Sequence, residues 1–243
     1  MARHLGEIMR YLVTGGAGFI GSHLVEELVN KNNSVIILDN FSSGKYSNIA
    51  KYEKNDENIE CIKGSIENVS LLKKLCAECD GIFHEAAMVS VLGSVSDPLR
   101  THAVNCTGTL NLLIAAREAG IKNVVIASSS AVYGDTTEMP QNETFTPRPL
   151  SPYAVSKLTG EYYSKVFSEL YGMKITNLRY FNVYGSRQDP SSDYAAVIPQ
   201  FITKILLRKP ITIHGDGNQT RDFIYVKDVV SANLNAMKYQ PLE

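Results

Sequence analysis

The sequence lacks several features that would mark common classes of protein. No apolar run approaches the roughly 18 residues of a membrane-spanning helix. Its 24 basic and 25 acidic side chains leave a formal net charge of −1, which argues against the basic surface of a nucleic-acid-binding protein. The amino-terminal residues form no signal peptide, because Glu7 and Arg10 interrupt any apolar stretch. We therefore expect a cytoplasmic protein with neither membrane nor nucleic acid as a partner.

Cysteine and histidine are too sparse to build a disulfide scaffold or a metal centre. The chain has four cysteines in 243 residues, and a reducing compartment is the default for such a composition. Cys76 and Cys79 form a C-x-x-C pair, but no second pair completes a zinc site, and both continue an apolar helical stripe. No two of the five histidines have metalloprotease spacing. We predict no metal, core packing for the two cysteines, and a structural role for His84.

Strand-like and helix-like segments alternate along most of the chain. The predicted strands cover residues 10–14, 34–38, 58–62, 81–84, 123–127 and 175–180, and the predicted helices cover residues 19–30, 69–78, 98–119 and 153–171. This alternation predicts an α/β fold with a doubly wound parallel sheet, covered by helices on both faces. From Ser186 onward the pattern loosens around prolines and glycines, which predicts a smaller lobe.

A glycine-rich turn directly follows the first predicted strand. Gly15 permits a tight turn, Gly18 leaves room for a pyrophosphate, and Gly21 allows close packing of helix on strand. Phosphates would meet the free amides at the start of the next helix. Asp39 ends the second strand, where a carboxylate binds ribose hydroxyls and repels a 2′-phosphate, which favours NAD over NADP. The alternative is a turn without a ligand and a strand-end cap at Asp39, but strand, helix and acid agree in favouring the nucleotide site.

Tyr153 and Lys157 lie four residues apart on a predicted helix and therefore share a face. A free tyrosine has a pKa of about 10, and a nearby ammonium together with a positive nicotinamide would favour its phenolate. Tyr153 is thus a candidate general base. The buried strand that precedes the pair ends in three hydroxyls, Ser128, Ser129 and Ser130, at the sheet edge where ligands bind. The alternative is a surface helix pair and a serine-rich turn.

Seven motifs occur in order: TGGAGFIGSHL, LDN, HEAA, SSSAVYG, SPYAVSK, LRYFNVYG and GDGNQTRDFIYVKD. Together they resemble the extended short-chain dehydrogenase/reductases, and among these the NAD-dependent nucleotide-sugar epimerases, of the type of UDP-glucose and UDP-N-acetylglucosamine 4-epimerase. The resemblance implies a Rossmann-type NAD-binding domain over residues 9–181 and 222–237. It also implies a smaller, C-terminally incomplete substrate lobe that includes residues 182–221, and an amino-terminal leader over residues 1–8.

The resemblance also implies individual roles. The catalytic residues would be Ser129, Tyr153 and Lys157. The cofactor would be NAD, bound by Gly15, Gly18, Phe19, Ile20, Gly21, Asp39, Asn40, Ser42, Ser43, Gly44, Ser65, Ile66, Ala86, Ala87, Met88, Asn105, Ser128, Tyr153, Lys157 and Tyr180. The UDP-sugar would be bound by Ser90, Ser129, Ser130, Asn182, Val197, His214 and Arg221. Arg221 would pair with the diphosphate and His214 would stack on uracil, although His214 is equally explained as an exposed loop residue.

The activity that the resemblance implies is a 4-epimerisation that interconverts UDP-glucose and UDP-galactose, or their N-acetyl forms, through a 4-keto intermediate with recycled NAD. Ser65 replaces the family's usual Asp, which predicts a weaker hydrogen bond to the cofactor. Ala131 replaces the acid that related 4,6-dehydratases and UDP-glucuronate decarboxylases carry, which favours epimerisation.

Two alternatives stay open. One is a dehydratase, decarboxylase or reductase on the same scaffold, and the other is a truncated NAD-binding fragment with impaired activity, because family members are longer. The predicted helices over residues 98–119 and 153–171 resemble those that pair between subunits, which implies a homodimer.

Overall fold

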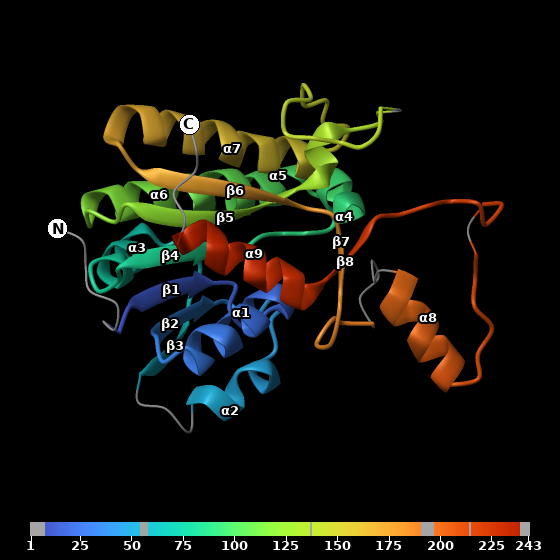
Figure 1. Cartoon of the computed structure of the whole chain (residues 1–243), viewed down its shortest axis with the longest axis horizontal. Coiled ribbons are helices and arrows are strands. Elements are labelled where there is room, and N and C mark those ends of the chain that lie inside the picture. Colours follow the sequence, from blue (N-terminus) through green and yellow to red (C-terminus); the bar gives the residue numbers. More distant parts are fainter. Residues whose placement is uncertain (1–7, 54–57, 137, 191–196, 214, 239–243) are drawn as a thin grey trace.

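A six-stranded parallel sheet forms the centre of the molecule (Figure 1). The computed structural model describes residues 8–53, 58–136, 138–190, 197–213 and 215–238. The strands are β1 (Arg10–Thr14), β2 (Ser34–Asp39), β3 (Ile59–Lys63), β4 (Gly81–His84), β5 (Asn123–Ser129) and β6 (Lys174–Tyr180). Their order is β3-β2-β1-β4-β5-β6. The chain adds β2 and β3 on one side of β1 and then crosses over to add β4, β5 and β6 on the other side, so the strand order reverses between β1 and β4. In open α/β sheets, ligands bind at this switch point, beyond the carboxyl ends of the strands.

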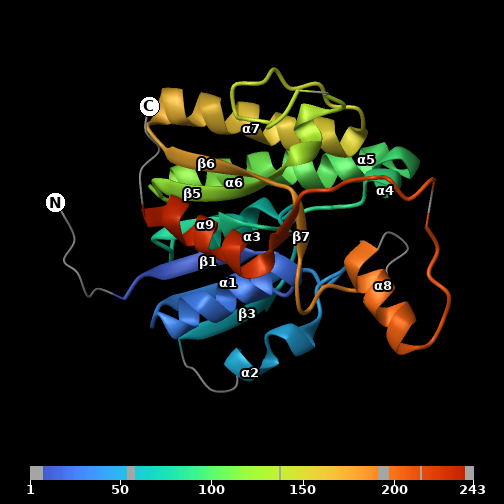
Figure 2. The same ribbon diagram turned by 45° about the vertical axis from the view of Figure 1, so that its right-hand side comes forward.

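Helices cover both faces of the sheet (Figures 1 and 2). One face carries α3 (Val69–Cys76), α4 (Val91–Ser96), α5 (Pro98–His102), α6 (Gly108–Glu118) and α7 (Pro152–Tyr171), and the other carries α1 (Phe19–Asn30), α2 (Ala50–Glu53) and α9 (Val226–Lys238). Successive strand residues point to opposite faces. Leu12 therefore packs into the core under α6 and α7, whereas Val13 packs into the core under α1 and α9. The predicted α/β architecture is confirmed.

One predicted helix differs from the structure. Residues 98–119 are helical almost throughout, but a π turn, η2 (Ala103–Thr107), separates α5 from α6. Apolar periodicity does not reveal such a turn, because the flanking segments keep their helical spacing. Two short 3-10 turns, η1 (Tyr46–Asn48) and η3 (Ser130–Tyr133), were also not predicted. π turns often occur at functional sites, and this one carries Asn105.

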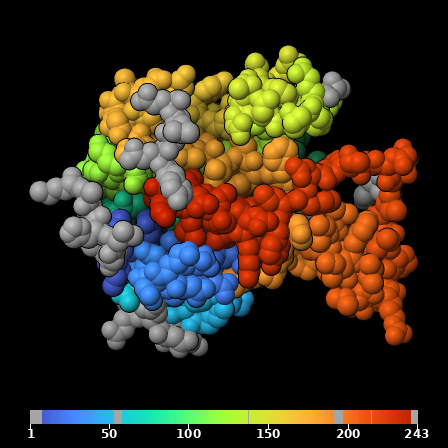
Figure 3. All heavy atoms as spheres, viewed as in Figure 1, coloured from blue at the N-terminus to red at the C-terminus, as the bar shows by residue number. Residues whose placement is uncertain are grey.

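The segment after β6 leaves the sheet and returns to it. β7 (Asn182–Tyr184) pairs in parallel with β8 (Phe223–Tyr225), and α9 then packs back on the sheet. Between these strands, α8 (Val197–Leu206) stands away from the sheet and its helices, and the space-filling view shows it as an arm (Figure 3). None of the ten residues of α8 is buried. The boundaries given above for a substrate lobe stay a prediction.

No helix among the described residues is both long and apolar enough to cross a membrane.

Candidate functional site

The glycine turn between β1 and α1 has the geometry of a phosphate site. Gly15 has φ +69°, and a Cβ there would lie 2.7 Å from the backbone nitrogen of Ala86. A Cβ on Gly21 would collide with the carbonyl oxygen of Gly15. No side chain caps the amino terminus of α1, and its first turn holds no acidic residue. The first-turn amides of Phe19, Ile20 and Gly21 are therefore free of a side-chain cap, as an anion site requires.

Asp39 ties the end of β2 to this turn. Its buried carboxylate accepts hydrogen bonds from the backbone amides of Ala17 (2.9 Å) and Phe41 (2.8 Å). A Cβ on Gly44 would lie 2.8 Å from either oxygen of this carboxylate, so the loop passes close over it. Asn40, Ser42 and Ser43 lie exposed alongside. Asp39 thus caps the end of its strand, as the alternative interpretation expected. Each of its carboxylate oxygens can still accept a further hydrogen bond from a ribose hydroxyl.

Hydrogen bonds also fix the loop that follows β4. The side-chain amide of Asn105 donates to the carbonyl of Met88 (3.0 Å) and to the hydroxyl of Ser156 (2.9 Å), while its oxygen accepts from the Met88 amide (2.8 Å). Below the loop, His84 bonds Thr14 (2.7 Å) and Thr109 (2.9 Å). Burial lowers the pKa of His84 to about 3. His84 is therefore neutral and structural, as predicted.

The structure brings Ser129, Tyr153 and Lys157 together. Tyr153 lies in the first turn of α7, where its backbone amide donates to the buried hydroxyl of Ser94 (3.0 Å). Its phenol lies beside the Ser129 side chain, which acts to lower the pKa of the phenol. Lys157 lies one turn further along α7, with its Nζ 5.9 Å from the centre of the Tyr153 ring and donating to the carbonyl of Ala127 (2.7 Å). A phenol, a hydroxyl and an amine thus converge at the end of β5.

One electrostatic expectation is not met by the chain alone. Lys157 and a bound nicotinamide together were expected to favour the phenolate of Tyr153. Without the nicotinamide, burial raises the pKa of Tyr153, and the neighbouring Ser129 side chain opposes that rise. Burial also lowers the pKa of Lys157 to about 8, against the opposing effect of Glu85. Tyr153 therefore needs a further positive charge in the site before it can act as a base near neutral pH.

A buried ion pair supports this group from below. The guanidinium of Arg179 donates to both carboxylate oxygens of Glu161 (2.9 and 2.7 Å), and the Ser128 hydroxyl donates to the same carboxylate (2.5 Å). The Arg179 and Glu161 side chains are only 16% and 12% exposed. Arg179 also lies 4.7 Å from the ring centre of Tyr133. The sequence analysis did not single out Glu161, although it follows Lys157 by four residues and therefore shares a helix face with the predicted catalytic pair.

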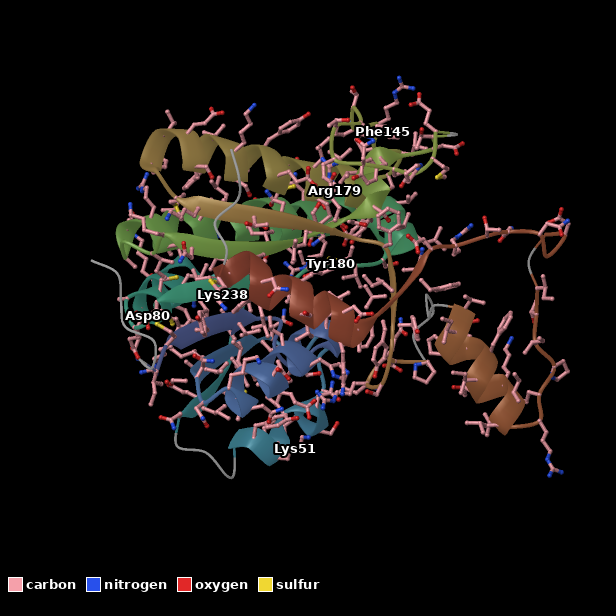
Figure 4. The ribbon with its side chains drawn as sticks, viewed as in Figure 1. Lys51, Asp80, Phe145, Arg179, Tyr180 and Lys238 are labelled. Atoms are coloured by element: carbon pink, nitrogen blue, oxygen red, sulfur yellow. The ribbon has the colours of Figure 1, made fainter. Side chains whose placement is uncertain are left out.

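A second polar group joins the predicted cofactor residue Tyr180 to two residues that the sequence analysis did not single out, Glu85 and Asn233. The Tyr180 hydroxyl donates to the carboxylate of Glu85 (2.8 Å) and accepts from the side-chain amide of Asn233 (2.6 Å). Figure 4 places Arg179 on the α7 side of β6 and Tyr180 on the α9 side, as strand alternation requires. Glu85 belongs to the HEAA motif and directly follows β4. An acidic residue directly after a buried strand is the sequence feature that could have identified Glu85 as part of the site.

The predicted substrate-binding residues lie less close to one another than the predicted catalytic residues do. Asn182 donates to the carbonyl of Asp222 from its backbone (3.1 Å) and its side chain (2.9 Å), which brings it beside the neighbour of Arg221. Arg221 is exposed, and Val197 lies at the exposed start of α8. Other predicted residues have local partners: Ser90 caps α4, Ser65 donates to Glu67 (3.0 Å), and Ile66 is buried against Gly108. His214 lies outside the described residues.

The two cysteines of the C-x-x-C pair pack against the core, as predicted. Burial raises the pKa of each thiol, Cys76 and Cys79, to about 12. They are consequently unreactive thiols at neutral pH. Within the described ranges, no group of three or more His, Cys, Asp or Glu side chains could hold a metal ion.

Comparison with known proteins agrees with this geometry. The family model described as "NAD dependent epimerase/dehydratase family" matches residues 11–241. A putative UDP-glucose 4-epimerase of Methanocaldococcus jannaschii is 44% identical over 94% of this chain and 73% of its own length. A UDP-N-acetyl-alpha-D-glucosaminuronate decarboxylase of Bacillus cytotoxicus is 40% identical over 94% of this chain and 71% of its own. The solved UDP-N-acetylglucosamine 4-epimerase of Methanobrevibacter ruminantium M1 superposes with a TM-score of 0.92 at 46% identity, covering 96% of this chain and 75% of that one.

Proposed function

The chain belongs to the NAD-dependent epimerase/dehydratase family, and on this premise we propose that it is a UDP-hexose 4-epimerase. Its substrates would be UDP-glucose and UDP-galactose or their N-acetyl forms. The observation that carries the proposal is the joint presence of an uncapped glycine turn and the convergence of Ser129, Tyr153 and Lys157 at the same edge of the sheet. The cofactor is NAD.

The residues present fit NAD. The free amides at the start of α1 would hold its pyrophosphate, and Asp39 would bind the adenosine ribose. Lys157 would hold the nicotinamide ribose beside Tyr153. When bound, NAD supplies a hydride acceptor that returns the hydride after the sugar has turned.

In this mechanism Tyr153 takes the proton from the C4 hydroxyl of the sugar and returns it to the same oxygen after the 4-keto sugar has turned its other face. Ser129, which lies beside the phenol, would hydrogen-bond the same sugar oxygen during the transfer. Asn182 and Arg221 would hold the diphosphate so that the 4-keto sugar can turn without leaving. We also propose that residues 182–221 form part of the substrate lobe, with Val197 near uracil.

A decarboxylase or dehydratase is the second candidate, because a decarboxylase is among the relatives at 40% identity. Ala131 argues against it. This residue lies in η3, directly after Ser129 and Ser130, and its methyl group can neither donate nor accept a proton. The dehydratases and decarboxylases that resemble this chain carry an acidic residue at this position.

Proton NMR of the anomeric signals tests the proposal. The chain would be incubated with NAD and, separately, UDP-galactose, UDP-N-acetylgalactosamine and UDP-glucuronate. We expect the 4-epimer of one of the first two to grow to a constant ratio with no net NADH. Release of CO2 from UDP-glucuronate would instead identify a decarboxylase. Binding of NAD with no conversion of any sugar would overturn the proposal for this chain.

We further propose that the chain forms a homodimer through an apolar face on α5 and α7. Leu99 is 83% exposed, and a stripe at helical spacing on α7 is exposed beside it: Val155, Tyr162, Val166 and Leu170. Exposed apolar side chains gathered on neighbouring helices in this way are typical of an interface. The four free cysteines support a reducing cytoplasm as the compartment.

Replacing Val166 with Glu should separate the two subunits. A symmetric interface would bury the new carboxylate twice without a partner, so we expect the dissociation constant to rise at least about 100-fold. Sedimentation velocity measures the change. Val69→Glu is the matched control, because Val69 is also exposed but lies on α3. A wild-type chain that sediments as a monomer at tens of micromolar contradicts the proposal.

A further inference from the structure

The segment that leaves β7 is fastened to the helix that opens the cofactor site. Residues 186–189, called the clasp below, have no role in the reaction described above. His23 on α1 is buried, and its Nε2 is hydrogen-bonded to the carbonyl of Ser186 (2.9 Å). The His23 ring lies edge-on to Phe19, with 6.1 Å between the ring centres. The clasp therefore reaches, through one side chain, the first residue of α1, where the pyrophosphate is expected.

Arg187 ties the clasp to the same helix and to α2. Its guanidinium donates to the carboxylate of Glu26 (2.5 Å) and, over longer distances, to the hydroxyls of Tyr52 (3.3 Å) and Ser22 (3.4 Å). The Arg187 and Glu26 side chains are only 18% and 28% exposed. The Arg187 backbone has φ +65°, a left-handed conformation that a residue with a side chain rarely adopts. Such a conformation persists where surrounding contacts hold it, so the guanidinium contacts fix the path of the clasp.

The clasp also holds the loop that follows β2. The ammonium of Lys45 pairs with the carboxylate of Asp189 (2.9 Å). The backbone amide of Lys45 donates to the carbonyl of Ala17 in the glycine turn (3.0 Å). This loop carries the residues predicted to surround the adenosine ribose, from Asp39 to Gly44. The clasp thus joins α1 to the ribose loop, the two elements predicted to hold the adenosine half of NAD.

We propose that Arg187 is a positioning residue for cofactor retention: it fixes the clasp against α1, and the clasp, through Asp189 and Lys45, holds the ribose loop in place and slows the release of NAD. A ligand held by a loop leaves only when that loop moves away. The proposal rests on the NAD cofactor of the family and not on the sugar that is converted. It assigns a function to contacts that neither the phosphate turn nor the proton-transfer group requires.

The two fastenings of the clasp should differ in strength. The pair of Arg187 and Glu26 is shielded from solvent, and the guanidinium makes further hydrogen bonds, so its loss frees the whole clasp. The pair of Lys45 and Asp189 is largely exposed, so water and salt weaken it. Removing Arg187 is therefore expected to have the larger effect.

Dissociation of NADH from the chain tests this without any sugar, so its failure is distinct from failure of the proposed epimerisation. The chain would be loaded with NADH and mixed with excess NAD, and the loss of NADH fluorescence would give the dissociation rate constant. In Arg187→Met we expect this constant to rise about fivefold, within the range for residues that act on a site through others. Arg187→Lys keeps the charge but not the planar fork, and its constant should lie between those of Arg187→Met and wild type.

Arg208→Met is the matched control for Arg187→Met. Arg208 also has a left-handed backbone, with φ +53°, but its side chain is exposed beyond the end of α8. Its replacement should leave the dissociation rate constant unchanged. A rise of less than about twofold in Arg187→Met, or an equal rise in both variants, overturns the proposal.

Lys45 and Asp189 give a second test that does not depend on the folding of Arg187→Met. Lys45→Met and Asp189→Asn should each raise the constant about twofold, and the double variant no further, because both remove the same ion pair. Their difference from wild type should shrink in about 1 M salt, where the Debye length is about 3 Å. A merely structural role would produce neither the shared effect nor its loss in salt. Additive effects of the two changes, or wild-type constants in both single variants, contradict the proposal.

Discussion

Replacing Tyr153 with Phe is expected to lower kcat for 4-epimerisation about 10³-fold, within the range for loss of a general acid-base group. The phenol lies beside Ser129 at the end of β5, and phenylalanine keeps the ring in its buried place while removing the exchangeable proton. NAD affinity should change less than about threefold, since the free amides at α1 and the carboxylate of Asp39 are untouched. Steady-state kinetics and NADH fluorescence titration measure the two quantities.

Tyr171→Phe is the control for this prediction, because it removes a phenol from the exposed carboxyl end of the same helix. Its kcat should equal that of wild type. Turnover of Tyr153→Phe within tenfold of wild type would contradict the assignment of Tyr153 as the base. An equal loss in both variants would point instead to damage of α7.

Replacing Glu161 with Gln is expected to lower the free energy of unfolding by about 3 kcal/mol, because it leaves the guanidinium of Arg179 buried without a countercharge. The two side chains are only 16% and 12% exposed, so solvent screens the pair weakly. The Ser128 hydroxyl loses its carboxylate acceptor at the same time. Urea denaturation followed by circular dichroism gives the difference, which is a large fraction of the stability of a typical domain.

The pair of Lys165 and Glu169 provides the control on the same helix. These side chains are 74% and 63% exposed, and Glu169→Gln should change stability by less than about 0.5 kcal/mol. Adding Arg179→Met to Glu161→Gln should recover part of the loss, since no unpaired charge then remains. A Glu161→Gln variant no less stable than Glu169→Gln would show that the pair does not support the catalytic strand.

The parts of the site that were predictable from sequence are those in which short spacing determines geometry. Gly15 and Gly21 act within one turn, Asp39 ends the neighbouring strand, and Tyr153 and Lys157 share one helix face. Their arrangement follows from local rules for βαβ units and helices. The predicted strands and helices of the main sheet followed from the same local patterns.

The parts that were missed depend on partners far apart in the chain. Glu85 is hydrogen-bonded to Tyr180, 95 residues later in the chain, and the Tyr180 hydroxyl is oriented in turn by Asn233. The π turn that presents Asn105 leaves the apolar pattern of its helix intact. The pKa of Tyr153 depends on how deeply the folded chain buries it, which spacing does not reveal.

The most direct test of the central claim, a 4-epimerisation with recycled NAD, is the fate of the C4 hydrogen. UDP-galactose carrying deuterium at C4 would be incubated with the chain and NAD in ordinary water, and the 4-epimer would be examined by NMR and mass spectrometry; the N-acetyl sugar would be labelled in the same way if it is the one converted. The account predicts that the product keeps deuterium at C4, because the abstracted hydride returns to the same carbon from the other face. A product that carries solvent hydrogen at C4 would contradict it.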